Sequence, residues 1–381
     1  MTKFQKEESD KCYVEYGVPQ GSVLGPLLFL MYINDIVSSS NLGEFVLFAD
    51  DTNIFVCGKT ADEAYHKANT LLNDVNSYMI LNQLHINVAK SCFIHFKPDL
   101  SRAQQTCARC RLFNRNHSLN LNGKKLQKVH STKFLGVVID ESLSWEPHLD
   151  HLAAKLNSCI VVIKRIKSCI PETEYNKIYN ALFMSHLSYC ISCWGGIPEH
   201  RLSKIFAIQK RCIRLLFGKC ANFDHKEFYL TCARARTIDQ HRAEKSYCLE
   251  HTKPLFNEHN ILTIHNLYLY HTFMETLKVL KFYSPTSIHG LLKFLPRNDK
   301  LLLMIPKVKL EVTKQNFVFK ASKVWNDHKV KIFHKSDPSD TGIIIPGNNE
   351  NSDLSISVGF AKTKLKSTLL LSQKLGDPIL W

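Results

Sequence analysis

The chain has 381 residues, of which 45% are hydrophobic and 22% charged, and its formal net charge is +15. This length predicts two or three domains, and the composition with its excess of positive charge favours an intracellular protein that contacts nucleic acid. Thirteen cysteines at irregular spacing, with no signal peptide, argue against a disulfide-rich secreted protein and favour reduced thiols in the cytoplasm or nucleus. No segment reaches the roughly 20 apolar residues that span a bilayer, so we expect no membrane partner.

A loop rich in glycine and proline comes first among the informative segments. It reads GVPQGSVLGP from Gly17 to Pro26 and continues into the apolar segment 27–36. The glycines at positions 17 and 21 would let the backbone approach a ligand closely. A structural role is also compatible with this pattern. In that role the loop is a rigid entry to a buried helix, with Pro26 in the first turn, where its missing N–H costs nothing.

The next informative segment is FVLFADDTNIFV, residues 45–56. Its apolar residues alternate on both sides of two adjacent carboxylates, which predicts a β-hairpin with Asp50 and Asp51 at its tip. Asp is also favoured in ordinary solvated turns, because its side chain hydrogen-bonds nearby amides. The preceding loop favours a functional site, since the two segments together are typical of a polymerase palm.

These two segments, in this order, resemble the reverse transcriptases of non-LTR (LINE-type) retrotransposons. The palm of that family carries GVPQGSVLGPLLFLMYIND and then an aromatic-Ala-Asp-Asp hairpin, and both are present here nearly letter for letter. The resemblance covers roughly the first 220 residues. It implies an α+β fold in which part of a palm, an antiparallel sheet backed by helices, precedes an α-helical thumb and a mostly helical C-terminal region. It also implies RNA-directed DNA polymerisation, with an RNA template and a DNA primer as partners.

The resemblance assigns roles to individual residues. Nucleotide addition uses two divalent ions roughly 4 Å apart, which carboxylate oxygens hold. Asp50 would bind Mg²⁺ or Mn²⁺ directly, and Asp51 would complete the coordination or tune the field. The residues expected to contact the incoming nucleotide and the template are Gly17, Pro19, Gln20, Gly21, Ser22 and Phe48.

A further metal-binding Asp is expected in this family, on a strand several tens of residues before the loop. Only 16 residues precede Gly17, and no apolar strand would position the acids among them, Glu7, Glu8, Asp10 and Glu15. We therefore expect incompletely coordinated ions and little or no polymerase activity from this chain alone, because positioning is most of what such enzymes contribute. Another polypeptide could supply the missing fingers and palm strand. The sheet edge left exposed predicts poor solubility.

The segment after the hairpin predicts a helix and then strands. Thr60 and Glu63 form a capping box, and a helical stripe follows at Ala64, Ala68, Leu71, Leu72, Val75, Tyr78 and Met79. Residues 84–96 are typical of a strand pair that carries Lys90, and they resemble the post-hairpin palm motif of the family. Lys90 would then face the triphosphate. The alternative is an ordinary solvated lysine in a turn.

Residues 97–133 hold nine Lys or Arg against a single acid, Asp99, which favours a phosphate-binding surface or a solvated basic one. Asn122 and Gly123 predict a hairpin between residues 119–121 and 126–129. The strand expected next, FLGVVID at 134–140, resembles the FLGV motif of the family. That likeness implies a grip on the primer end by Phe134, Leu135 and Gly136. The alternative is a buried strand whose glycine packs beneath a helix.

Beyond Trp145 the apolar period becomes helical. Three helices are predicted, the first over residues 149–166, the second opened by Pro171 and the third over 202–217, where Gly218 ends it. In the third helix the apolar side carries Leu202, Ile205, Phe206, Gln209, Ile213 and Leu216. Phosphate contacts, which fix position without reading sequence, are expected from Lys204, Lys210, Arg211 and Arg214.

These patterns predict five regions: a partial palm at 1–140, a helical thumb-like domain at 141–220, a helical region at 221–336, a flexible linker at 337–353 and a C-terminal helix at 354–381. The CxxC pairs Cys107/Cys110 and Cys190/Cys193 lack the second half of a zinc site, and we expect the latter pair to be buried. Two functions follow. The chain is a truncated reverse transcriptase without turnover, or it is a non-catalytic RNA- or DNA-binding protein derived from such an element.

Overall fold

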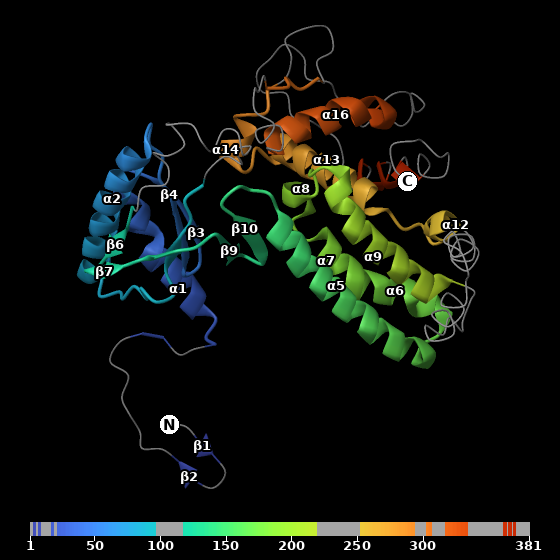
Figure 1. The fold of residues 1–381 in the computed structure, drawn as a ribbon, viewed down its shortest axis with the longest axis horizontal. Coiled ribbons are helices and arrows are strands. Elements are labelled where there is room, and N and C mark those ends of the chain that lie inside the picture. Colours follow the sequence, from blue (N-terminus) through green and yellow to red (C-terminus); the bar gives the residue numbers. More distant parts are fainter. Residues whose placement is uncertain are drawn as a thin grey trace, which may run out of the picture. The chain divides into compact units, whose positions relative to one another are not determined.

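The computed structural model describes residues 3–4, 7–8, 17–18, 21–96, 117–218, 252–293, 302–306, 317–333, 361–363, 365–367 and 369–370. They fall into a first unit, residues 1–130, and a second unit, residues 131–381 (Figure 1). Among the described residues the first unit holds two small hydrophobic clusters and the second holds one larger cluster. Helices and small two-stranded sheets make up both units, which confirms the α+β class. Within these ranges no helix has the length and apolar character needed to cross a bilayer.

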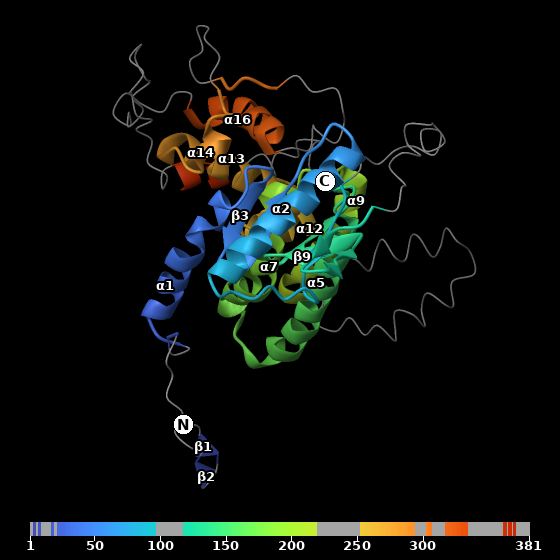
Figure 2. The same cartoon turned by 90° about the vertical axis from the view of Figure 1, so that its left-hand side faces the viewer.

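A β-hairpin covered by one long helix forms the centre of the first unit. Strand β3 (Glu44–Phe48) pairs antiparallel with β4 (Asp51–Phe55), as the alternating pattern predicted, and α2 (Ala61–Leu81) lies alongside them (Figure 2). The buried contacts between hairpin and helix are made by Phe45, Leu47, Ile54, Leu71 and Val75. Because side chains alternate along a strand, the other face exposes Val46, Phe48 and Phe55.

The predicted capping box starts α2. The Thr60 hydroxyl oxygen accepts a hydrogen bond from the Glu63 amide at 3.2 Å, and the Glu63 carboxylate accepts one from the Lys59 amide at 2.9 Å. Amides in the first turn of a helix have no partner within the helix, so these contacts stabilise its start.

Before the hairpin lies α1 (Leu24–Ile33), which continues into η1 (Asn34–Ser38). Ser22 Oγ accepts a hydrogen bond from the Gly25 amide at 3.1 Å, and Pro26 lies in the first turn, as predicted. The expectation that this helix is buried is wrong within the described part of the first unit, because Ile33 is the one buried residue of α1. Leu24 is 62% exposed and Met31 is 67% exposed.

Three short strand pairs complete the first unit. They are β1 (Lys3–Phe4) with β2 (Glu7–Glu8), β6 (Asn120–Leu121) with β7 (Lys124–Lys125), and β5 (Cys92–Phe93) parallel with β8 (Gln127–Lys128). Positive φ angles at Asn122 (51°) and Gly123 (72°) form the predicted hairpin turn. The strand pair expected over residues 84–96 is wrong. Only β5 forms there, because Asn87 accepts hydrogen bonds from the amides of Lys90 and Ser91 and closes a turn.

The second unit begins with a hairpin where one strand was expected. Strand β9 (Ser131–Phe134) pairs antiparallel with β10 (Val137–Asp140). Leu135 and Gly136 form the turn between them, with φ angles of 44° and 84°. A glycine in the left-handed region ends a strand, so FLGVVID divides into two strands at this point.

A helical bundle follows the β9–β10 hairpin. Helices α5 (Glu146–Ile166) and α9 (Glu199–Phe217) lie side by side, and both match predicted helices (Figure 1). Helical turns after Pro171 confirm the second predicted helix, but they are divided into η4 (Glu172–Glu174), α6 (Tyr175–Ile178), the π-helical η5 (Tyr179–Met184) and α7 (Ser185–Ser188). The remaining short turns are η3 (Lys167–Cys169) and α8 (Ile191–Trp194).

The C-terminal elements join the same core. They are α12 (Thr252–Glu258), α13 (Ile264–Phe282), α14 (Thr286–His289) and α16 (Phe317–Phe333). The fully buried aromatic residues of this core include Tyr179, Phe183, Trp194, Phe273 and Trp325. Within the expected C-terminal helix the described residues are helical, and Ala361, Leu365 and Leu369 are buried. The expected linker at 337–353 lies outside the described residues.

The expected burial of the second CxxC pair is wrong for one of its cysteines. In the single turn of α8, Ile191 and Trp194 take the buried positions, three residues apart. Cys193 is therefore exposed, and Cys190 is half-buried. The first pair, Cys107 and Cys110, lies outside the described residues.

Candidate active site

Asp50 and Asp51 lie at the tip of the β3–β4 hairpin. Phe48 and Asp51 form the last pair of the ladder, and Ala49 and Asp50 form the turn, with Ala49 at a φ angle of 51°. Residues directly opposite each other in a ladder share a face of the sheet, so Asp51 lies on the outer face together with Phe48. Phe48 is 59% exposed, and both carboxylates are exposed as well. The hairpin thus presents two adjacent acids to solvent.

The carboxylates have the donor chemistry that a divalent ion requires. Mg²⁺ and Mn²⁺ prefer oxygen ligands, which Asp50 and Asp51 supply. In the described ranges, however, no group of three or more His, Cys, Asp or Glu side chains is placed to hold a metal ion. Two neighbouring carboxylates are too few for a two-ion clamp, so the described residues do not by themselves fit a pair of catalytic ions.

The glycines of the loop before α1 have left-handed backbone. Gly17 and Gly21 have φ angles of 96° and 86°, and no heavy atom of the described residues lies within 4 Å of the position that a Cβ would take at either residue. Ser22 is committed to the Gly25 amide, so its hydroxyl also has a structural role. Pro19 and Gln20 lie outside the described residues.

Lys90 lies on an exposed turn of the first unit. Its amide donates to the Asn87 carbonyl at 3.1 Å. This geometry is that of an ordinary solvated lysine in a turn. The expected contact with a triphosphate stays a prediction.

The predicted primer-grip residues form the β9–β10 turn of the second unit. Phe134, Leu135 and Gly136 are partly buried, and the Tyr189 hydroxyl donates a hydrogen bond to the Leu135 carbonyl at 2.6 Å. A Cβ at Gly136 would lie 3.2 Å from Tyr189 Cε1. The turn is therefore packed beneath Tyr189, which follows α7. Its role toward a primer stays a prediction.

The four basic residues expected to contact phosphates lie along α9, and some of them hold α9 to α5. Lys204 Nζ lies 2.6 Å from Asp150 Oδ1, and Arg211 donates a hydrogen bond to the Asn157 side chain. Lys210 Nζ lies 4.1 Å from the centre of the Phe206 ring, and burial lowers the pKa of this lysine. Arg214 is half-buried. A nucleic acid bound here would compete with contacts inside the unit.

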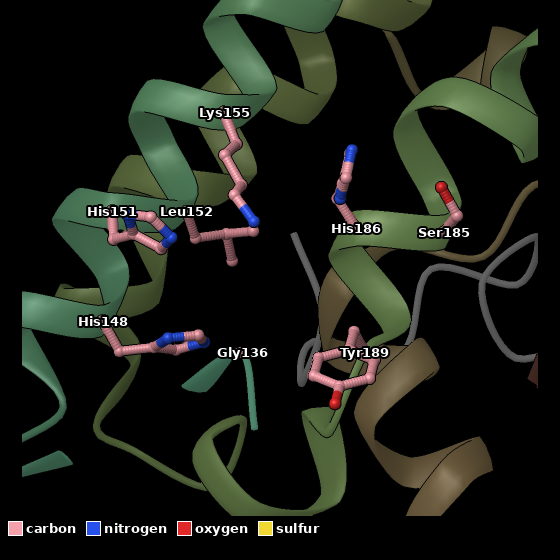
Figure 3. Close-up of a pocket in the computed structure, with 8 residues that line it drawn as sticks. All are labelled: Gly136, His148, His151, Leu152, Lys155, Ser185, His186 and Tyr189. Carbon is pink, nitrogen blue, oxygen red and sulfur yellow. The ribbon is translucent and has the colours of Figure 1, made fainter. Parts of the chain in front are cut away.

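A pocket in the second unit was not expected from the sequence. It has a volume of about 300 Å³ and is lined by Gly136, His148, His151, Leu152, Lys155, Ser185, His186 and Tyr189 (Figure 3). The sequence contains one indication of this pocket. The spacing of His148, His151 and Lys155 places them on one face of a helix directly after the FLGV segment.

Comparison with known proteins places the hairpin and the loop in one family. Residues 1–139 match the family model for reverse transcriptase (RNA-dependent DNA polymerase). The chain is 25% identical over 216 residues to the RNA-directed DNA polymerase from mobile element jockey of Drosophila funebris, which covers 54% of this chain and 22% of that relative. Residues 1–139 are thus similar to reverse transcriptases, and the relatives are polymerases of non-LTR retrotransposons. The resemblance seen in the sequence is thereby confirmed.

Two further relatives show the same extent of similarity. The probable RNA-directed DNA polymerase from transposon X-element of Drosophila melanogaster is 23% identical over 57% of this chain and 23% of its own length. The Pol polyprotein from type-1 retrotransposable element R1 of Bradysia coprophila is 24% identical over 55% of this chain and 20% of its own length. The chain thus spans about a fifth of the length of these relatives. No solved structure matches it significantly.

Proposed function

We propose that this chain contributes part of the active site of an RNA-directed DNA polymerase that copies an RNA template from a DNA primer. The observation that carries the proposal is the exposed Asp50–Asp51 pair at the hairpin tip, inside the segment that matches the reverse transcriptase family. In this proposal residues 1–140 belong to a palm, and the helices of residues 141–220 form a thumb that holds the primer–template duplex by its backbone.

The chain by itself is proposed not to extend primers. Phosphoryl transfer depends on positioning, and among the described residues no third metal-ligating side chain joins Asp50 and Asp51. A second polypeptide that supplies fingers and a further palm strand would complete the site. The apolar surface of α1 supports such a partner, because Leu24, Leu27 and Met31 are 62%, 55% and 67% exposed.

Primer extension tests both parts of the proposal. The purified chain is incubated with an RNA template, a labelled DNA primer and deoxynucleotides, in Mg²⁺ and then in Mn²⁺. We expect salt-sensitive binding of the duplex without extension. The matched variants are Asp50→Asn with Asp51→Asn, and Asp35→Asn, which removes one carboxylate from η1 instead of the hairpin.

Extension that is lost with Asp50→Asn and Asp51→Asn but kept with Asp35→Asn would show that the chain is active alone. It would also establish the catalytic role of the hairpin. Extension that all variants retain would mean that a contaminating polymerase is at work. Failure of the chain to bind primer–template at low salt would contradict the proposal as a whole.

A non-catalytic nucleic-acid-binding protein is the second candidate function, and the basic side of α9 favours it. In that case Asp50→Asn should leave the affinity for primer–template unchanged, because binding would depend on the second unit. Replacing Lys210, Arg211 and Arg214 with Gln should weaken binding and flatten its salt dependence. The control removes equal charge from elsewhere in the same unit, through glutamine at Lys164, Arg165 and Lys177. Equal losses from both triple variants would contradict a specific role of α9.

A further inference from the structure

The pocket of the second unit gathers nitrogen donors from one face of α5. The side chains of His148, His151 and Lys155 extend from α5 toward the helix that carries Ser185 and His186 (Figure 3). Gly136 and Tyr189 lie at the same end as His148. The lining residues include no Asp or Glu, so the only formal charge that they contribute at neutral pH, apart from the histidines, is the ammonium group of Lys155.

His148 is the most constrained of these residues. Its side chain is 4% exposed, and its Nδ1 accepts a hydrogen bond from the Val138 amide at 3.3 Å. A neutral imidazole carries one proton, so the acceptor role of Nδ1 places that proton on Nε2. His148 Nε2 is buried and has no hydrogen-bond partner among the described residues. A buried N–H group without a partner is rare in proteins, so Nε2 is a donor that a ligand in the pocket would satisfy.

His151 repeats the feature one turn along the helix. Its Nε2 is also buried and has no partner in the described part of the chain. Burial lowers the pKa of His148 to about 4 and also lowers that of His151, and Lys155 adds to both shifts. Both rings are therefore neutral near pH 7. They offer hydrogen bonds beside a fixed positive charge.

The hydroxyl groups of the pocket are already engaged. Ser185 Oγ donates to the Ala181 carbonyl at 2.6 Å, and the Tyr189 hydroxyl donates to the Leu135 carbonyl at 2.6 Å. The free donors are therefore the imidazoles and the ammonium group. The described residues offer no cluster of three metal-ligating side chains here. A ligand that carries several acceptor oxygens and a negative charge satisfies these groups best.

We propose that this pocket binds a phosphate group, held by His148 Nε2, His151 and Lys155. In the chain bound to nucleic acid, the group would be a phosphodiester of the primer–template backbone, and this part rests on the proposed function. The volume of about 300 Å³ suits a small group, since it lies at the lower end of ligand pockets. His148 Nε2–H and the Lys155 ammonium group are donors, and a neutral His151 ring can supply one more N–H, which fits the acceptor oxygens of a phosphate.

Two substitutions separate the roles of the two His148 nitrogens. In His148→Asn the amide oxygen can still accept from Val138, but the donor toward the pocket is lost. In His148→Gln the longer side chain places an amide donor near the Nε2 position. Lys155→Gln removes the charge from the pocket, and Lys164→Gln removes the same charge from an exposed position on the same helix. Lys155 is half-buried, so its substitution tests the pocket even if the His148 variants fold poorly.

The first measurement is a titration of the full chain with inorganic phosphate at constant ionic strength. The NMR signals of the histidine ring nitrogens report the binding. Chloride serves as the control anion. We expect phosphate to shift the His148 and His151 signals. We expect Lys155→Gln to lower the affinity for phosphate roughly tenfold, as for the loss of a hydrogen bond to a charged group. Lys164→Gln should respond like the wild type. Ring signals that do not respond to phosphate would overturn the proposal.

The second measurement is the affinity for a labelled primer–template duplex, by fluorescence anisotropy. If the bound group is a backbone phosphodiester, His148→Asn and Lys155→Gln weaken binding more than His148→Gln and Lys164→Gln do. A phosphate response with unchanged duplex affinity would overturn the backbone assignment and support a site for free phosphate. The phosphate titration needs neither nucleic acid nor catalysis, so its outcome is independent of the primer-extension test.

Discussion

Tyr189 holds the turn of the β9–β10 hairpin through Leu135, whose carbonyl accepts the Tyr189 hydroxyl at 2.6 Å. The neighbouring Gly136 has a φ angle of 84°, and a Cβ there would lie 3.2 Å from Tyr189 Cε1. One side chain therefore sets both the position of the turn and the residue type that the turn accepts. The pocket proposed to bind phosphate is lined by Gly136 and Tyr189, so its shape depends on this contact.

Gly136→Ala is expected to destabilise the second unit by about 2 kcal/mol, because left-handed backbone costs a non-glycine residue about 1–2 kcal/mol and the new methyl group must displace the Tyr189 ring. Urea unfolding measures the change. Gly123→Ala is the matched control. Its φ angle of 72° is similar, but no atom of the described residues lies within 4 Å of the new Cβ. An equal loss in both variants would show that the Tyr189 contact contributes nothing.

Ala49 adopts a conformation in the Asp50–Asp51 hairpin that favours glycine, with a φ angle of 51°. Ala49→Gly relieves this strain but makes the unfolded chain more flexible, so the free energy of unfolding should change by less than about 0.5 kcal/mol. The same substitution at Ala68, inside α2, should cost about 1 kcal/mol. Urea unfolding compares the two. A larger loss at position 49 than at position 68 would contradict the geometry of the turn.

Gln209 joins three segments of the second unit although it is fully buried. Its side-chain amide donates to the Tyr179 hydroxyl and to the Leu262 carbonyl, each at 3.0 Å, and its oxygen accepts from the Ile264 amide at 2.9 Å. Gln209→Leu should cost about 3 kcal/mol, because it leaves buried backbone groups without partners. Tyr179→Phe removes one hydrogen bond and should cost about 1 kcal/mol. Similar losses in both variants would mean that the backbone contacts of Gln209 contribute little.

Local patterns in the sequence predicted the elements that local chemistry determines. The β3–β4 hairpin, the cap at Thr60 and the turn at Asn122 each depend on residues close together in the chain, and all three are confirmed. The hairpin inside FLGVVID was missed because apolar residues on both sides of Gly136 are equally typical of one strand or two. Periodicity gives the inner side of a helix but not its neighbours, so the sequence did not show that Gln209 hydrogen-bonds to Tyr179 and to the start of α13.

The candidate site was predictable to a similar degree. Asp50 and Asp51 were placed correctly at a hairpin tip, because the alternation of their neighbours is strong. The pocket was missed because its lining residues come from segments that are adjacent only after folding, such as His148 on α5 and Tyr189 after α7. Single histidines in a helical pattern carry no signal of burial, and an imidazole nitrogen without a partner is visible only in three dimensions.

The stability of the second unit should fall as the solution becomes acidic, and His148 is the main histidine responsible. Burial lowers its pKa from 6.5 to about 4, so between these values the unfolded chain binds a proton that the folded chain does not. The free energy of unfolding is therefore unaffected by His148 above pH 6.5, and it falls by up to about 3 kcal/mol as the pH falls to 4. His151, His265 and His271 also have pKa values lowered chiefly by burial, so they act in the same direction.

Urea unfolding between pH 7 and pH 4 should show a smaller loss of stability for His148→Asn than for the wild type, since the variant has no imidazole to protonate at this position. Identical pH profiles would mean that His148 already binds its proton in the folded chain, and its Nδ1 could then not accept a hydrogen bond from the Val138 amide.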